Sequence, residues 1–354
     1  MKLQAQQLEV SADPAALQDY FEARGWTDGL PVVPPTAELV ARMVAGSGLP
    51  PDQPVATLAP SQAVATVEKV AINAVMAGCR PEYMPVVVAA VRGLAKPQWN
   101  LAGVQATTHA ASPMLVVHGP IRTRIGINSG TNVFGQGFRA NATIGRAVRL
   151  VLTNIGQGIP GKTDMAVFGT PCKFTFCAGE NEEASPWQPR HVELGMSPQD
   201  SAVTLHAGEG PHNIQDHGSR VAQELLLTFA DTMNITGNNN AGLGGEMMLV
   251  IGPEHARIFA GAGMSKDDIR QELHRRMRLR LDRFGSGVRA WYRKRRKAID
   301  VGPEVEEIPY LDDPRQILIV VAGGPGLHSM VVPSFGGMSS SVLEKIEEPS
   351  PPQG

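Results

Sequence analysis

The sequence has no stretch of about 20 consecutive apolar residues, the length that a membrane-spanning helix requires. Its first residues, MKLQAQQLEVSADP, contain no apolar run of the kind found in secretory signal peptides. Cysteine is scarce, with three residues and no CxxC pair, so neither a disulfide framework nor a structural zinc site is indicated. We therefore predict a cytoplasmic protein that makes no membrane contact and whose thiols are reduced.

Charge is also limited and nearly balanced. A net charge of −2, with 19% charged residues, argues against nucleic-acid binding by the chain as a whole. The exception is residues 270–297, which contain twelve Lys and Arg but only two acidic residues. Such a run is typical of a solvated helix face, and the alternatives are contact with RNA, an acidic partner or a neighbouring subunit.

Glycine and proline are plentiful, with 38 and 28 residues, which favours many turns and short elements over a helical bundle. Residues 1–105 nevertheless have helical patterns. Asp13 and Thr36 are in position to cap two helices, and residues 62–77 have apolar side chains at helical spacing up to Gly78. We therefore predict a helical N-terminal region.

Three later segments, 113–120, 246–255 and 316–326, each contain a short apolar run that ends in Gly-Pro. Runs of this length and composition suit buried strands, and each is followed by small residues. We predict an α/β fold in which the N-terminal helical region packs on a mixed β-sheet core with three weakly repeated strand-Gly-Pro units. The core would span residues 106–345, and residues 346–354 would form a disordered tail.

The glycine-rich stretch 126–150, GINSGTNVFGQGFRANATIGRAVRL, precedes a helical pattern. The spacing of its glycines partly matches the G-x-G-x-x-G/A fingerprint of dinucleotide-binding proteins, but no strand precedes them. A loop that binds an anion, here called an anion cradle, is therefore the better interpretation. We expect Asn141 to cap the helix, with Arg139 beside it, so that free backbone N–H groups bind a carboxylate or phosphate. Asn128 and Asn132 are further candidates for substrate binding, and a connection without a ligand is the alternative.

Cys79 stands between the predicted helix end at Gly78 and a new helix start at Pro81. A thiol at a helix N-terminus beside Arg80 should have a lowered pKa and act as a nucleophile or redox group. Arg80 is a candidate substrate ligand in the same turn. The alternative is a small buried residue in a tight connection between helices.

Residues 171–191, PCKFTFCAGENEEASPWQPRH, begin with alternation typical of a strand, which would place Lys173 opposite the phenylalanines. The loop beyond it contains Glu180, Glu182 and His191, which we predict to move protons, with Lys173 as a substrate contact. A solvated loop is the alternative.

Histidines gather further on, and His206, Glu209 and His212 have a spacing that offers an alternative metal site. These three lie in a predicted turn rather than on a helix face, so no cofactor is predicted and a metal ion is only the alternative. Asn238 and Asn239, in a run of amides and glycines, either bind a polar ligand or occupy turn positions.

Several phrases taken together resemble a bacterial family of proteins of about this length, which is associated with proteins that carry a Cys/Sec-Gly-Ser-Cys motif, called UGSC proteins. The phrases are TDGLPVVPPT, VAINAVMAGCRPEYMPVV, GINSGTNVFGQGFRANATIGRA, FCAGENEEASPW and GPEHARIFAGAGMSKDDI. The resemblance implies thiol or selenol chemistry delivered by a partner. This sequence lacks the UGSC motif itself, and Cys79 is the only residue that approaches it in type.

These features predict an enzyme, homo-oligomeric, that acts on a small anionic or polar metabolite. The reaction would be a thiol-assisted, lyase-like elimination or a thiol-linked reduction, that is, the work of a lyase or an oxidoreductase. One alternative is a metal-dependent hydrolase that uses the histidines between 191 and 217. The other is a non-catalytic subunit of a UGSC-type redox partner.

Overall fold

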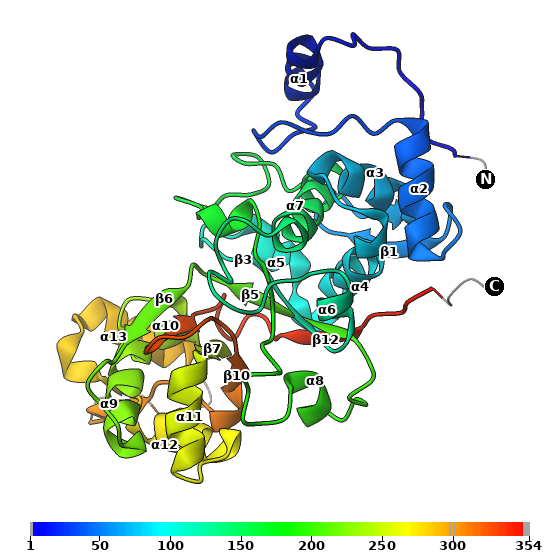
Figure 1. Ribbon diagram of the computed structural model, residues 1–354. Coiled ribbons are helices and arrows are strands. Elements are labelled where there is room, and N and C mark those ends of the chain that lie inside the picture. The colour runs from blue at the N-terminus through cyan, green and yellow to red at the C-terminus, as the bar shows by residue number, and fades with distance from the viewer. Residues whose placement is uncertain (1–2, 297–298, 301, 303, 350–354) are drawn as a thin grey trace.

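The computed structural model describes residues 3–296, 299–300, 302 and 304–349. The predicted N-terminal helices are present, with one β-hairpin among them (Figure 1). The elements are α1 (Pro14–Ala23), α2 (Ala37–Ser47), β1 (Pro54–Leu58), β2 (Ala63–Thr66), α3 (Val67–Ala77), α4 (Met84–Leu94) and α5 (Leu101–Ala106), with 3-10 turns at Pro81–Tyr83 and Pro97–Trp99.

The predicted caps are confirmed. Asp13 accepts a hydrogen bond from the Ala16 N–H, Thr36 accepts one from the Leu39 N–H, and Gly78 ends α3 in the left-handed region at φ 86°. The helix predicted over residues 62–77 begins only at Val67, because residues 63–66 pair with β1 as the second strand of the hairpin.

The apolar runs that end in Gly-Pro all form buried strands, and the predicted mixed α/β fold is confirmed, with two sheets in its core. The described residues form two four-stranded sheets, with orders β12-β5-β3-β4 and β10-β7-β11-β6. The first predicted strand lies in one sheet and the other two lie side by side in the second. The strands are β3 (Ser112–His118), β4 (Cys177–Gly179), β5 (Ala202–Gly208), β6 (His212–Gln215), β7 (Met247–Ile251), β10 (Ile317–Val321), β11 (His328–Val332) and β12 (Val342–Lys345).

The two sheets repeat one pattern of pairing. In the first, β4 and β3 are parallel, and β5 and β12 follow antiparallel. In the second, β10 and β7 are parallel, and β11 and β6 follow antiparallel. The chain passes from β5 of the first sheet to β6 of the second, and from β11 of the second to β12 of the first, so the halves exchange their last strands. The two halves are therefore similar, and of the three predicted units the strands β3 and β7 take equivalent places in them, whereas β10 takes the place of β4.

The sheets stack face to face, and helices cover their outer faces (Figure 1). Val116, Val250 and Val320 represent the apolar layer between the sheets. One outer face packs against α3, α4 and α7, and the other against α9, α11 and α12. The remaining helices are α6 (Ile121–Arg124), α7 (Arg139–Asn154), α8 (Arg190–Glu193), α9 (Ala222–Met233), α10 (Asn239–Leu243), α11 (Pro253–Gly261), α12 (Lys266–Arg276) and α13 (Ser286–Arg295).

The parallel strands of both sheets end at the same edge of the sandwich. Asn181, which follows β4, donates its N–H to Val321 O at 2.7 Å and its side-chain amide to Gly323 O at 3.2 Å. Gly323 in turn donates to Ser129 O at 2.8 Å. Since ligands of α/β sheets bind beyond the carboxyl ends of the strands, we expect a ligand-binding site at this edge.

Helices on both sides of the predicted boundary at residue 105 share one apolar core. In the predicted tail, residues 350–354 lie outside the described part of the chain. Among the residues that the structure describes, no helix has the length and apolar character needed to cross a membrane.

Candidate functional site

A buried histidine ends β3. Strand alternation turns His118 to the same side as Val116, between the two sheets. Its Nδ1 lies 2.7 Å from Glu180 Oε2, and its Nε2 lies 2.7 Å from Thr204 Oγ1. The three side chains are fully buried, and they join the end of β3 and the residue after β4 to β5. His118 is not among the residues predicted from the sequence, where its only signal is a titratable residue at the end of an apolar strand.

Glu180 is a buried carboxylate with several polar partners. It accepts a hydrogen bond from the Arg190 N–H at 2.9 Å, and Lys266 Nζ lies 3.8 Å from its other oxygen. Burial raises the pKa of Glu180, but the hydrogen bond and charge of His118, the charge of Lys266 and the Arg190 N–H together bring it below the usual value. Glu180 is therefore ionised at neutral pH.

Glu182 and His191, two of the site residues predicted from the sequence, lie beside this pair. Glu182 Oε1 accepts from the Gly119 N–H at 2.6 Å and lies 3.0 Å from Arg122 Nε. The His191 ring is fully buried, and neither of its nitrogens has a partner with hydrogen-bond geometry. Burial, followed by the neighbouring His118, lowers its pKa, so the ring is neutral. Its Nδ1 lies 4.0 Å from Glu182 Oε1.

A cavity of about 460 Å³ lies along the same edge. The loop 131–135 lines one side of it and the loop 322–326 lines the other, with His328 and Ser329 at the start of β11. The two loops touch at Gly324 and Thr131. A Cβ atom on residue 324 would lie only 2.1 Å from Thr131 Oγ1, so this close approach requires glycine. The predicted glycine-rich stretch therefore does border a pocket, and Asn132 is among the lining residues.

Two of the lining residues of this pocket, Ser329 and His328, are each paired with a histidine. His255 Nε2 lies 3.2 Å from Asp216 O and therefore carries a hydrogen, so Nδ1 accepts from Ser329 Oγ at 2.9 Å. Burial lowers the pKa of His255, which keeps the ring neutral. At the exposed side, His328 Nε2 lies 3.1 Å from His217 Nε2, and His328 Nδ1 lies 3.0 Å from Asn213 Oδ1.

The predicted anion cradle at the start of α7 is wrong in its details. The helix begins at Arg139 after Phe138, and no side chain caps it. Asn141 lies inside the helix and holds the backbone of Asn128 through two hydrogen bonds, of 2.8 and 2.9 Å. Arg139 donates twice to Gly78 O, at 3.1 and 2.9 Å. Asn141 therefore fixes the glycine-rich loop and Arg139 fixes the turn at Gly78, and neither side chain lines the pocket.

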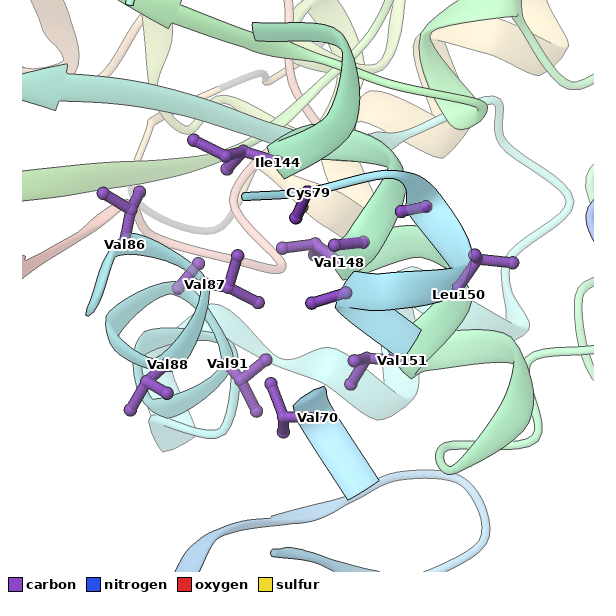
Figure 2. Close-up of a cluster of buried hydrophobic side chains, with 14 of the residues drawn as sticks. Val70, Cys79, Val86, Val87, Val88, Val91, Ile144, Val148, Leu150 and Val151 are labelled. Atoms are coloured by element: carbon purple, nitrogen blue, oxygen red, sulfur yellow. The ribbon is translucent and has the colours of Figure 1, made fainter. Parts of the chain in front are cut away.

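The lowered pKa predicted for Cys79 is also wrong. Figure 2 shows Cys79 among buried apolar side chains, between Ile144 and Val148. Its Sγ donates to Thr143 O at 3.2 Å, and burial raises its pKa to about 12. Arg80 turns away to Glu82, at 3.8 Å, and helix α4 begins only at Met84, so no helix N-terminus is available to stabilise a thiolate.

We expect Cys79 to resist thiol reagents in the folded protein. With a pKa of about 12, the thiolate fraction near neutral pH is on the order of 10⁻⁵, and thiolate is the reactive form. Iodoacetamide labelling followed by peptide mass spectrometry, with and without urea, measures this. Cys79 should be labelled only in urea, whereas the part-exposed Cys172 serves as the control under native conditions. Native labelling of Cys79 at the rate of Cys172 would contradict the burial argument.

The other predicted substrate ligands lie apart from both the His118–Glu180 cluster and the pocket. Lys173 belongs to a 3-10 turn, not to the predicted strand, and is paired with Asp164 at 2.6 Å. The strand β4 starts later, at Cys177, where parallel pairing with β3 becomes available. Asn238 caps α10 and accepts from Tyr310 OH. Asn239 lines a smaller cavity of about 300 Å³.

The alternative metal ligands His206, Glu209 and His212 do not come together. His206 is buried, contacts Ser341 Oγ at 2.9 Å, and has a pKa lowered to about 4, mainly by burial. Glu209 is paired with His109 at 2.7 Å, and His212 is exposed on β6, in the other sheet. The one group of potential ligands within the described residues is His118, Glu182 and His191, with one donor atom each within 4.8 Å of the others.

Ion pairs offset much of the charge of the basic segment. Arg270 lies 2.5 Å from Glu193, Arg278 lies 3.0 Å from Glu307, and Arg296 lies 2.9 Å from Asp312. The predicted solvated helix face does not describe the whole segment, because it spans the end of α12, a 3-10 turn and α13, and because Arg270 and Arg296 are buried.

No protein-family model and no curated protein matches this sequence. The resemblance to the family associated with UGSC proteins therefore remains a prediction.

Proposed function

We propose that this protein is an enzyme that binds a small polar or anionic metabolite in the pocket between loops 131–135 and 322–326 and transfers a proton on it, in a lyase-like reaction. The observation that carries this proposal is the convergence of two glycine-rich loops on a pocket that also contains a paired histidine, His328, and a hydroxyl, Ser329. Concave sites with a few convergent polar groups are the usual location of catalysis.

The walls of the pocket suit a carboxylate or carbonyl oxygen. Among the described residues, no acceptor bonds the backbone N–H of Gly324 or Gly326, so both are available to a ligand. Glycine also lets a ligand approach the backbone closely. The lining residues that the structure describes include no Lys or Arg, which favours a singly charged or neutral polar group over a polyphosphate.

The proton chemistry follows from the tautomers. Asn213 Oδ1 accepts from His328 Nδ1, so the neutral ring carries its hydrogen there and His328 Nε2 has the free lone pair. His217 donates to that nitrogen across 3.1 Å. A substrate that enters the pocket can displace His217 from His328. The free Nε2 of His328 then removes a proton from the substrate. Ser329, held by the neutral His255 and by the Gly252 N–H at 3.0 Å, orients the substrate.

The burial of Cys79 favours one of the two reactions expected from the sequence. A thiol with a pKa of about 12 inside an apolar helix cluster supports neither nucleophilic nor redox chemistry. We therefore propose the lyase-like reaction, with His328 rather than the Cys79 thiol as the group that takes the proton. A non-catalytic subunit of a redox partner is the competing outcome, and it predicts no turnover by the isolated chain.

Hydrogen–deuterium exchange tests the proposal without a known product. A panel of 2-hydroxy, 2-oxo and 3-hydroxy carboxylates is incubated with the protein in D₂O and followed by proton NMR. We expect protein-dependent exchange or loss of at least one compound, reduced by about 10²-fold or more in His328→Gln, since general acid–base catalysis contributes roughly 10²–10⁴.

His212→Gln is the matched control, because His212 is exposed on the neighbouring strand β6 outside the lining of the pocket. It should retain the wild-type rate. An active protein whose His328→Gln variant exchanges at the wild-type rate would place the chemistry elsewhere.

A further inference from the structure

A buried histidine without partners requires an explanation. The His191 side chain is 0% exposed, and both ring nitrogens lack hydrogen-bond partners among the described residues. The Pro198 backbone, the smallest of the influences on the pKa of His191, raises that pKa but forms no bond to the ring with hydrogen-bond geometry. Buried polar groups are nearly always paired, and an exception points to a bound ion or water.

We infer that His118, Glu182 and His191 bind a divalent transition-metal ion. Their donor atoms lie within 4.8 Å of one another, and the imidazole and carboxylate of His191 and Glu182 are 4.0 Å apart. Two imidazoles and one carboxylate form a set that such ions take, zinc among them. Ligands about 2 Å from a tetrahedral ion stand roughly 3.3 Å apart, so closure requires movements of about 1 Å.

The surroundings are arranged as a metal site requires. Glu180 holds His118 through Nδ1 at 2.7 Å, which leaves Nε2 for the ion once the Thr204 hydroxyl rotates away. A carboxylate that orients a ligating histidine in this way is a common outer partner of metal sites. Glu182 is fixed in turn by the Gly119 N–H and by Arg122.

The ion would join two parts of the chain. His118 ends β3, whereas Glu182 and His191 belong to the segment that follows β4. Binding would therefore fix this segment against the first sheet, and the segment also carries Asn181, which contacts the glycine-rich loop at Gly323. The inference does not depend on the proposed proton transfer, because no ligand of the ion lines the pocket.

Zinc binding to the full-length protein tests this inference. Chelator-treated wild-type protein is titrated with Zn²⁺ by calorimetry, and its thermal midpoint is measured with and without the ion. We expect one ion per chain and a higher midpoint, because a ligand that binds only the folded state stabilises it. Co²⁺ in place of Zn²⁺ should give visible absorption bands of a four- or five-coordinate ion, which needs no variant. Failure to bind one equivalent of either ion would overturn the inference in favour of a water-filled cluster.

Substitutions identify which residues bind the Zn²⁺ ion. Glu182→Gln and His191→Gln should each lower the Zn²⁺ affinity at least tenfold, and Glu180→Gln should lower it about 10- to 100-fold as an outer partner. The exposed pair His217 and His328 is the competing zinc site, so His328→Gln must bind Zn²⁺ as the wild type does. The exposed His212→Gln is a second control. If His328→Gln or His212→Gln loses the ion, or if Glu182→Gln and His191→Gln both keep it, the assignment to this cluster is wrong.

Discussion

Replacing Glu180 with alanine is expected to lower the free energy of unfolding by about 3–5 kcal/mol, the usual effect of removing one partner from a buried ionic group. Glu180 is fully buried and is the shared partner of His118, Lys266 and the Arg190 N–H. Lys266 is only 6% exposed, so its charge would remain inside with Glu193 as its nearest acid at 3.2 Å. The change therefore leaves polar groups buried that have lost their partner.

Glu183→Ala is the matched control. Glu183 also pairs with a buried arginine, Arg122, but its own side chain is 63% exposed. Water can replace it, so the loss should be no more than about 1 kcal/mol. Urea unfolding of both variants, measured with a chelator present so that no metal contributes, separates the two cases. Equal losses in Glu180→Ala and Glu183→Ala would show that the buried network contributes little to stability.

Part of this arrangement follows from the sequence. Glu180, Glu182 and His191 follow a segment with strand-like alternation, and loops at strand ends are where polar side chains gather. His118 was not predicted, since a histidine in a buried strand looks the same whether it packs in a core or faces a cluster. The direction of the Cys79 side chain was missed for a similar reason. A turn between two helices specifies nearby charges, but not whether the thiol points inward to α7.

The arrangement of the sheets lies further beyond the sequence. Short runs buried on both faces identify β3, β7 and β10 as strands without indicating which strands pair. The exchange of β6 and β12 between the sheets depends on contacts between segments more than 100 residues apart, for example Val331 with His212. Local patterns do not contain such contacts.

The similar halves use their common edge in different ways. Beyond β3 and β4 the space is filled by charged and imidazole side chains, among them Glu180 and His118. Beyond β7 and β10 the equivalent space is lined by Gly323 and Gly324 and stays open as a pocket. Asn181 links the two through its hydrogen bonds to the loop after β10. A closed cluster that fixes the edge, next to an open pocket that binds a ligand, is consistent with both proposals.

Acid is expected to destabilise the protein from about pH 6.5 downward, and His206 should account for a large part of the effect. Burial lowers the pKa of His206 to about 4 in the folded protein, against 6.5 for an ordinary histidine. Between these values the unfolded chain binds the additional proton, so the free energy of unfolding falls as the pH falls. The difference corresponds to about 3 kcal/mol, fully present above pH 6.5 and lost at pH 4.

His206→Gln provides the test, with His212→Gln as the control at an exposed histidine on β6. The His206 variant should be less stable at neutral pH, because His206 contacts Ser341 Oγ and Val332 O, but its stability should depend less on pH. The lowered pKa values of His191 and His255 act in the same direction and leave a residual slope. Urea unfolding at intervals between about pH 7.5 and 4.5 measures these slopes. If His206→Gln and His212→Gln give the same slope as the wild type, the neutral buried state of His206 is not the cause of the acid sensitivity.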